Sequence, residues 1–173
     1  MKAEEKYALL SGWIYMNVLV REYEECDAKK ISNIITRNLF EVNIEDYGKE
    51  EIYKQAEKFK PEDIIKKFKN RLTYVAIYEG NVIGTASICN DFVKDKSIYW
   101  LLTVFVLPEY HKKGIGRILI EKLEEKARKL NAKRIIVDPS ITGKNFYRKL
   151  GYEYEKSVDI LNDEGHIKME KYL

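Results

Sequence analysis

The sequence predicts a single domain of the α/β (α+β) class, and three observations indicate it. Residues 101–107 are apolar and rich in β-branched and aromatic side chains, as in a strand buried on both faces. After Pro108 and a basic loop, the apolar residues of 115–130 recur at helical spacing. Residues 73–78 and 82–89 are strand-like runs around a Glu-Gly-Asn turn. Strands therefore alternate with at least one long amphipathic helix.

Length and composition agree with one globular domain. The 173 residues are 45% hydrophobic and 34% charged, which allows a buried core and a charged surface. The net charge of +3 is too small to indicate nucleic-acid binding. The apolar run 7–20 is too short to span a membrane, and it follows two glutamates and lacks a small-residue cleavage motif, unlike a signal peptide. We therefore expect neither nucleic acid nor membrane as a partner.

Cysteine and histidine usage predicts a cytoplasmic protein without a metal. Cys26 and Cys89 have neither a metal-ligand spacing nor a disulfide pattern, so a reducing compartment is expected. His111 and His166 have no partners at ligand spacing. The sequence leaves open whether the chain forms a homodimer.

The first half of the chain is expected to be mainly helical. Residues 1–16 are predicted to be an N-terminal extension that could form a short helix, and residues 17–173 the domain itself. A strand is expected at 18–23. Asp27 would cap the helix that follows, whose apolar face holds Ile31, Ile34, Ile35 and Leu39. Two further helices are predicted near 50–58 and 62–69, the second with Pro61 in its first turn.

The second half is expected to supply most of the strands. Besides the two-strand hairpin, a central strand is predicted at 97–107 and a short one at 134–137. A helix follows, capped by Ser140 or Thr142 and ended by Gly151. Two closing strands are expected near 153–158 and 166–171, with a turn at 162–165 between them.

The loop at residues 111–117 has the features of an anion-binding site. The first N–H groups of a helix have no partner within it and carry a partial positive charge. Gly114 and Gly116 lack the Cβ atoms that would hold a ligand away, and Lys112, Lys113 and Arg117 add full charges. This combination suits a diphosphate. The alternative is an ordinary strand-to-helix turn with a solvated basic rim.

Two segments carry a resemblance to a known family. Residues 108–117, Pro-Glu-Tyr-His-Lys-Lys-Gly-Ile-Gly-Arg, resemble the acyl-CoA loop of the GNAT superfamily of N-acetyltransferases, Gln/Arg-x-x-Gly-x-Gly/Ala between a strand and a helix. His111 stands where the family usually has Gln or Arg, so altered binding geometry is expected. Residues 140–152 resemble the second motif of the family, although Ser140 replaces its Asn and Gly143 its Ala; the matching residues are Phe146, Tyr147, Lys149, Leu150, Gly151 and Tyr152.

This resemblance, which covers roughly residues 17–173, implies the GNAT fold: a central mixed, mostly antiparallel sheet of about six to seven strands, splayed at its central strands and flanked by about four helices. It also implies acetyl transfer from acetyl-CoA (coenzyme A) to an amine, with Tyr147 as the proton donor to the departing thiolate. Without the resemblance, core packing would be the preferred interpretation of this tyrosine. The implied cofactor-binding residues are Phe105 and Val106 along the pantetheine, His111, Lys112, Lys113, Gly114, Ile115, Gly116 and Arg117 at the diphosphate, and Ser140, Gly143, Phe146 and Lys149.

The sequence leaves the base and the acceptor open. Residues 97–107 contain no acid, so a carboxylate base on the central strand is not expected. Acids that could act through a water are Asp91, Glu109, Glu22 and Glu24, but a solvated surface acid is the preferred interpretation of each. Three functions are compatible with these features. They are acetylation of a small-molecule amine or polyamine, acetylation of a peptide or protein amine at its N-terminus or at lysine, and CoA binding without turnover by a sensor or structural subunit.

Overall fold

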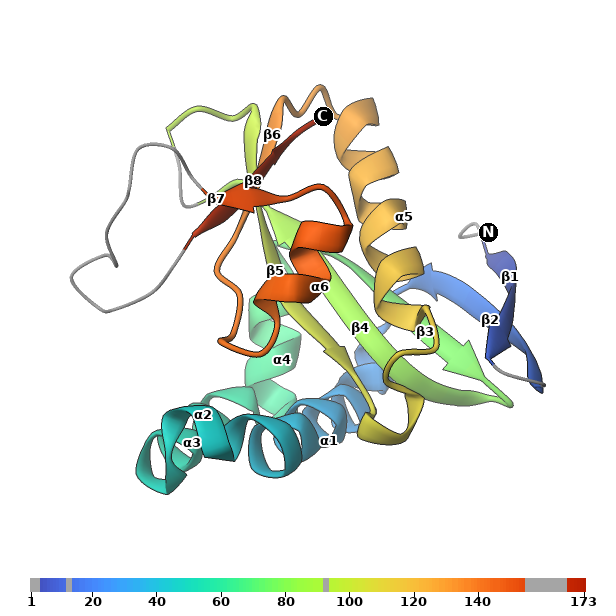
Figure 1. The fold of residues 1–173 in the computed structure, drawn as a ribbon, viewed down its shortest axis with the longest axis vertical. Helices are drawn as coiled ribbons and strands as arrows, with labels where there is room; N and C mark the ends of the chain where they lie inside the picture. Colours follow the sequence, from blue (N-terminus) through green and yellow to red (C-terminus); the bar gives the residue numbers. More distant parts are fainter. Residues whose placement is uncertain (1–3, 12–13, 92–93, 155–167) are drawn as a thin grey trace.

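The computed structural model describes residues 4–11, 14–91, 94–154 and 168–173. Within these residues the chain forms one sheet of eight strands in the order β1-β2-β3-β4-β5-β6-β8-β7 (Figure 1). Neighbouring strands are antiparallel except β5 and β6, which are parallel. The mixed, mostly antiparallel sheet agrees with the prediction, with slightly more strands than expected. The strands are β1 (Glu5–Ser11), β2 (Ile14–Glu22), β3 (Leu72–Tyr78), β4 (Asn81–Cys89), β5 (Ile98–Val106), β6 (Arg134–Val137), β7 (Glu153–Tyr154) and β8 (Met169–Tyr172).

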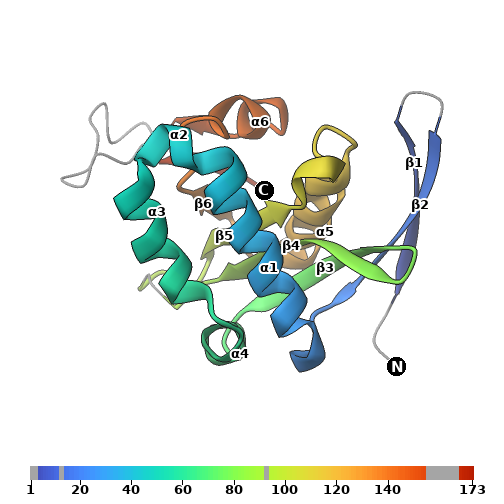
Figure 2. The same ribbon diagram turned by 90° about the horizontal axis from the view of Figure 1, so that it is seen from below.

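Helices cover both faces of this sheet, and each face has its own hydrophobic core (Figure 2). One core packs α1, α3 and α4 against side chains such as Val75 and Val82. The other packs α5 against β2, β3 and β4. The helices are α1 (Ala28–Asn38), α2 (Ile44–Tyr47), α3 (Lys49–Ala56), α4 (Pro61–Phe68), α5 (Ile115–Lys129) and α6 (Lys144–Lys149), and a π-helical segment at Leu39–Asn43 joins α1 to α2.

The expectation of an N-terminal helix is wrong, because residues 5–11 form β1. Exposure alternates along β1, with Tyr7 and Leu9 packed on the core and Lys6 and Ala8 facing solvent. A period of two fits a strand and does not fit a helix. Glu5 also forms an ion pair with Lys122 of α5, which ties β1 to the rest of the fold. The division into an extension and a domain stays a prediction.

The cap that was expected for α1 is also wrong. Asp27 lies at the N-cap position, but its side chain makes no capping hydrogen bond. Its carboxylate instead accepts two hydrogen bonds from Arg21, at 2.7 and 2.9 Å, and one from the backbone N–H of Glu24 at 2.9 Å. A hydrogen bond from a charged guanidinium is stronger than one from a neutral backbone N–H, so the Asp27 carboxylate bonds Arg21 instead of capping α1.

The hairpin of β3 and β4 confirms the predicted strand pair, with the turn one residue earlier than expected. Glu79 and Gly80 are the two turn residues, with φ values of 49° and 76°. Positive φ at both positions is what a two-residue hairpin turn requires, and glycine adopts it without strain. Asn81 belongs to β4.

Strand β5 is less buried than its sequence indicates. Most of its side chains are half-buried; Leu101 and Val106 are buried. Its pairing with β6 runs only from Ile98 to Leu101, opposite Arg134 to Val137, after which β6 ends and the chain turns toward α6. The central strands are therefore splayed, as expected, and residues 102–106 border a gap.

The closing strands are shorter than expected within the described residues. β7 contains Glu153–Tyr154 and β8 contains Met169–Tyr172. The predicted turn at 162–165 and the strand position of His166 lie outside the described residues. β8 lies between β6 and β7 in the sheet.

Candidate active site

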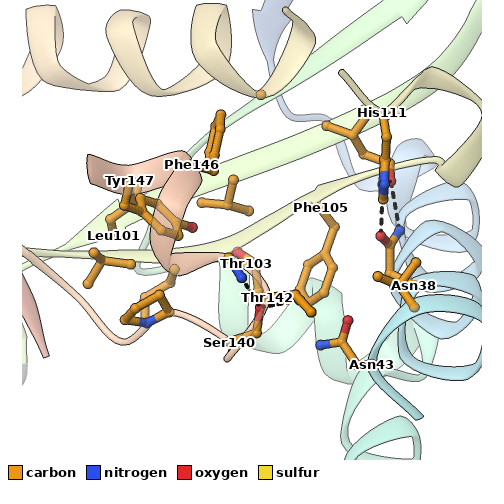
Figure 3. Close-up of a pocket in the computed structure, with 18 of the residues that line it drawn as sticks. Asn38, Asn43, Leu101, Thr103, Phe105, His111, Ser140, Thr142, Phe146 and Tyr147 are labelled. Atoms are coloured by element: carbon orange, nitrogen blue, oxygen red, sulfur yellow. Dashed lines mark hydrogen bonds between the residues drawn. The ribbon is translucent and has the colours of Figure 1, made fainter. Parts of the chain in front are cut away.

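A cavity of about 740 Å³ lies where β5 parts from β6. Residues 101–106 of β5 form one wall of it. The N-terminal end of α5 and the start of α6 line it on one side of the sheet, and α1 with the segment that follows lines it on the other. Figure 3 shows labelled side chains of β5, α6, α1 and the segments beside them around the same space.

The start of α5 offers backbone N–H groups to this cavity. Gly114, the N-cap residue, has a φ of 86°, and no side chain caps the helix. The N–H of Ile118 makes the first bond of the helix, to the carbonyl of Gly114 at 3.1 Å, so the N–H groups of Ile115, Gly116 and Arg117 have no carbonyl within the helix to bond. Lys112 also has a positive φ of 59°, and such left-handed residues curve the backbone so that N–H groups converge.

The two lysines of this loop differ in position. Lys112 lines the cavity, as Arg117 does. Lys113 does not; its ammonium lies 5.1 Å from the ring centroid of Tyr110. A lysine over an aromatic ring is held there by the electrostatic attraction of the ring face.

Gly116 is required by the packing of α5 on α6. A Cβ atom at Gly116 would lie 3.1 Å from Cζ of Phe146, closer than ordinary carbon contacts. The absence of a side chain therefore lets the Phe146 ring approach the first turn of α5. Both residues line the cavity.

His111 points inward instead of toward the basic loop. Its Nε2 lies 2.7 Å from the carbonyl oxygen of Val106 and 3.1 Å from Oδ1 of Asn38 (Figure 3). Both partners are acceptors in this arrangement, because the Asn38 amide nitrogen donates to the carbonyls of Ile34 and Val106, each at 2.8 Å. Nε2 must therefore carry a proton. His111, which stands where the family motif usually has Gln or Arg, therefore holds the end of β5 to α1.

Sequence reasoning missed Asn38, although a signal was present. Asn38 is 5% exposed and lies four residues after Ile34 on the apolar face of α1. An amide on an otherwise apolar stripe must find partners when it is buried. That rule would have predicted that Asn38 belongs to a polar network, but it would not have identified the partners of Asn38 in that network.

Tyr147 is buried, 7% exposed, within α6. Its ring makes edge-on contacts with Phe146 at 5.2 Å and Tyr152 at 5.8 Å between centroids. Burial raises the pKa of the Tyr147 hydroxyl well above its ordinary value, because the phenolate would lose its hydration. The hydroxyl points into the cavity, on the side of Thr103 (Figure 3). It is therefore a proton-bearing donor at neutral pH.

Gly143 is required by its close contact with Ser140. A Cβ atom at Gly143 would lie 2.9 Å from Oγ of Ser140. The N–H of Gly143 donates to the same oxygen at 3.2 Å and to the Ser140 carbonyl at 3.0 Å. Ser140 thus bonds the turn that leads into α6. The prediction that Ser140 or Thr142 caps this helix is wrong, because Gly143 is the N-cap residue and no side chain caps it. Both residues line the cavity.

Thr103 marks an irregularity in β5 that the sequence did not reveal. Its φ is 49°, although a β-branched residue strongly disfavours this conformation. The register between β4 and β5 shifts at the same place, between Thr85 and Ser87. At this irregularity the hydroxyl of Ser87 on β4 donates to the carbonyl of Leu102 on β5 at 3.2 Å and also hydrogen-bonds with the Thr103 hydroxyl. This bulge redirects the strand where it borders the cavity.

Most of the residues that the sequence marked for the site meet at this cavity, and two do not. Lys113 and Lys149 are absent from its lining; those that line it are Phe105, Val106, His111, Lys112, Gly114, Ile115, Gly116, Arg117, Ser140, Gly143, Phe146 and Tyr147. Lys149 is exposed on the surface of α6.

None of the four acids considered as a base lines the cavity. Glu109 is about half exposed and accepts a hydrogen bond from Arg37 at 2.9 Å, which holds the pKa of its carboxyl below the ordinary value. Glu24 and Asp91 are exposed, and Glu22 lies on β2. Among the described lining residues Asp138 carries the one carboxylate.

Within the described ranges, no cluster of three or more histidine, cysteine or acidic side chains could hold a metal ion. None of the helices there has the length and apolar character that a membrane span requires.

A splayed mixed sheet with the N-terminus of a helix at the splay is the arrangement expected of the GNAT fold. Comparison with known proteins agrees. Residues 36–152 match the model of the Acetyltransferase (GNAT) family, which is more than half of the chain. The protein belongs to this family.

Three individual proteins show how similar the known relatives are to this chain. An uncharacterised N-acetyltransferase of Chlorobaculum tepidum is 38% identical over 84 residues, which are 48% of this chain and about half, 51%, of that protein. The PaiA N-acetyltransferase of Thermoplasma acidophilum, solved with coenzyme A, superposes with a TM-score of 0.80 at 20% identity over 91% of this chain and 100% of that one. A GCN5-related N-acetyltransferase of Rhodopseudomonas palustris gives 0.73 at 25% identity over 89% and 94%. The structural matches establish the GNAT fold.

Proposed function

We propose that this protein is an N-acetyltransferase that moves the acetyl group of acetyl-CoA directly to the primary amine of a small molecule. The observation that carries the proposal is that one cavity joins the open N-terminus of α5 to the buried hydroxyl of Tyr147. The first is suited to a diphosphate and the second to a leaving thiolate.

The start of α5 fits the diphosphate of coenzyme A. The N–H groups of residues 115–117 are free of bonds within the helix, and Lys112 and Arg117 line the same space. Because Gly114 and Gly116 have no side chains, a ligand can approach these N–H groups closely. Backbone donors at a helix N-terminus and full positive charges are the usual means of binding a diphosphate.

The free edge of β5 fits an extended pantetheine arm. Beyond Leu101 this edge has no pairing with β6. The carbonyl of Val106 already accepts hydrogen bonds from Asn38 and His111, so it has less capacity to bond a ligand than the sequence suggested. The carbonyl of Leu102 likewise accepts a hydrogen bond from Ser87, so Thr103 and Val104 leave more of the edge available.

Tyr147 is assigned the role of donor to the departing sulfur. Acetyl-CoA supplies an activated thioester, which a neutral amine can attack and from which a thiolate must leave. A thiol has a pKa of about 8.5 and an ordinary tyrosine of about 10. Because burial raises the pKa of Tyr147 further, its hydroxyl serves better as a hydrogen-bond donor to the thiolate than as the source of a fully transferred proton.

No carboxylate base is assigned to the amine. The four acids considered lie away from the cavity lining. The acceptor can therefore reach its neutral form by losing a proton to water.

Turnover with acetyl-CoA and a panel of primary amines tests the proposal. We expect release of free coenzyme A that depends on the amine. Tyr147→Phe should lower kcat about ten- to a hundredfold and leave the affinity for coenzyme A nearly unchanged, because only the hydroxyl is lost. Tyr110→Phe removes another hydroxyl from the same cavity and should keep turnover. Binding of coenzyme A without release by any amine would instead support a CoA-binding module.

A further inference from the structure

We propose that the acceptor carries an anionic group, a carboxylate or a phosphate, and that Arg71 with Lys67 binds this group while the amine faces the thioester. This inference rests on the proposed function and names the substrate class for it. It depends on two cations that line the same cavity as Tyr147.

Arg71 lies at the end of the cavity away from the diphosphate loop. It precedes Leu72, which pairs with Ile88, and Ile88 pairs with Leu101. The loop before α5 instead follows Val106, which pairs with Gly84. Arg71 and the start of α5 are thus at opposite ends of the segment of β5 that borders the cavity, so Arg71 is poorly placed for the diphosphate and well placed for an acceptor.

The Arg71 guanidinium lacks a counter-charge in the described part of the chain. It is half-buried, and neither an ion pair nor a hydrogen bond joins it to a described residue. The centroid of the Phe68 ring lies 5.9 Å from its Cζ. Burial lowers the pKa of Arg71, which reflects the cost of the unpaired charge. Guanidinium groups bind carboxylates and phosphates through paired N–H donors.

Lys67 adds a second positive charge at the same end. Its ammonium donates to the carbonyl of Lys58 and lies 4.5 Å from the Phe59 ring centroid. Asp63, Asp91 and Lys66 line an adjoining hollow together with Lys67 and Arg71, yet neither acid forms an ion pair with Arg71. An ammonium has three N–H donors, and that of Lys67 makes one hydrogen bond and one ring contact. It can therefore donate to a further acceptor oxygen.

The charges of the whole cavity agree with this substrate class. Lys112 and Arg117 are assigned to the diphosphate of coenzyme A, so the cations of the lining that remain for an acceptor are Lys67 and Arg71, against the one carboxylate of Asp138 among the described residues. A polyamine brings several positive charges and no anion, so this lining repels it. An amino acid or a phosphorylated amine brings an anion to Arg71 and a primary amine that can lose its proton.

Matched acceptors that differ only in the anionic group test the inference. The pairs are L-ornithine with putrescine, L-lysine with cadaverine, and phosphoethanolamine with ethanolamine. We expect kcat/KM to be about ten- to a hundredfold higher for at least one anionic member, because a charge-assisted bond is lost in its partner. The pair that shows the preference identifies carboxylate or phosphate as the group recognised.

Variants assign the preference to Arg71. Arg71→Met should raise KM for the anionic acceptor about ten- to a hundredfold, while kcat, and KM for the counterpart that lacks the anion, stay nearly unchanged; Arg71→Lys should restore part of the lost affinity. Lys69→Met removes an exposed lysine two residues earlier and should change nothing. Equal kcat/KM within every pair, or an Arg71→Met loss shared by both members, would overturn the inference.

A binding measurement separates this inference from the proposed function. Calorimetric titration of L-ornithine and putrescine into the protein saturated with coenzyme A reports acceptor binding without turnover. Ornithine-selective binding that Arg71→Met abolishes supports the anion site even if no acetyl transfer occurs. Transfer to amines, or to a peptide amine, without any dependence on Arg71 supports the acetyltransferase and rejects the anion site.

Discussion

At the scale of single residues, Asn38 and His111 join three elements through one carbonyl group. Both side chains bond the carbonyl of Val106, at 2.8 and 2.7 Å, and Nε2 of His111 also contacts Oδ1 of Asn38. The bonds link α1, the end of β5 and the loop before α5. They fix where β5 stops and thus where the loop before α5 begins.

Removing the amide should destabilise the fold. Asn38→Leu keeps a similar volume but loses three hydrogen bonds in a buried site, so the free energy of unfolding should fall by about 1–3 kcal/mol. Urea unfolding measures the change. Asn43→Leu is the control, because Asn43 is half-buried in the same cavity and makes no hydrogen bond with another described residue. Equal losses in the two variants would contradict a special role for Asn38.

Sequence reasoning at this scale succeeded where a residue belongs to a motif and failed where its partner is distant. Tyr147 was marked because its neighbours Phe146 and Gly151 complete a pattern. Asn38 lies 73 residues before His111, and nothing in the order of residues joins the two. Arg71 and Thr103 likewise acquire meaning only when the sheet places them against the cavity.

At the scale of elements, the start of α5 depends on the left-handed conformation of Gly114. Gly114 has a φ of 86°, and a Cβ atom there would lie 3.4 Å from Leu9 of β1, an ordinary contact. Gly80 in the β3–β4 hairpin has a similar φ of 76° and open space around it. The two glycines therefore differ in location and not in backbone strain.

This pair allows a controlled test of the loop. Gly114→Ala and Gly80→Ala should each lower the free energy of unfolding by about 1 kcal/mol, because alanine resists a positive φ. Only Gly114→Ala should weaken coenzyme A binding, since it disturbs the N–H groups at the start of α5. Thermal unfolding and calorimetry measure the two effects. Weakened binding in Gly80→Ala, or none in Gly114→Ala, would place the diphosphate elsewhere.

Elements with a strong local pattern were predictable, and those that depend on tertiary pairing were not. The periodicity of α5 and the Glu-Gly-Asn turn located α5, β3 and β4 closely. β1 was missed because its alternation is short and its partner β2 continues the same apolar run. The half-buried state of β5 was missed because composition cannot distinguish a strand under a helix from one beside a cavity.

At the scale of the whole molecule, the buried tyrosines couple stability to alkaline pH. Tyr147 is 7% and Tyr152 1% exposed, and burial raises the pKa of both hydroxyls. In the unfolded chain a tyrosine has a pKa of about 10. Above that pH the unfolded state loses these protons first, so stability is full below about pH 10 and falls above it.

The slope of this fall is measurable. Each buried tyrosine should lower the free energy of unfolding by about 1.4 kcal/mol per pH unit above pH 10. Tyr147→Phe should make the slope shallower by one such contribution in urea unfolding between pH 9 and 12. Tyr154→Phe, at a tyrosine that is 48% exposed, should leave it unchanged. A slope unaffected by Tyr147→Phe would mean that water reaches this hydroxyl in the folded state.

The insertion of β8 between β6 and β7 has a consequence for biosynthesis. β8 bonds Arg134–Val137 on one side and Glu153–Tyr154 on the other, and its Lys171 forms an ion pair with Glu124 of α5 at 2.7 Å. A nascent chain leaves the ribosome from its N-terminus, so the helices and β1 to β6 emerge while this slot is still vacant. Until β8 has been synthesised, the edges of β6 and β7 that it will pair with are unpaired. An unpaired edge can bond a strand of another chain, so the growing polypeptide depends on chaperones or on rapid completion to avoid such pairing.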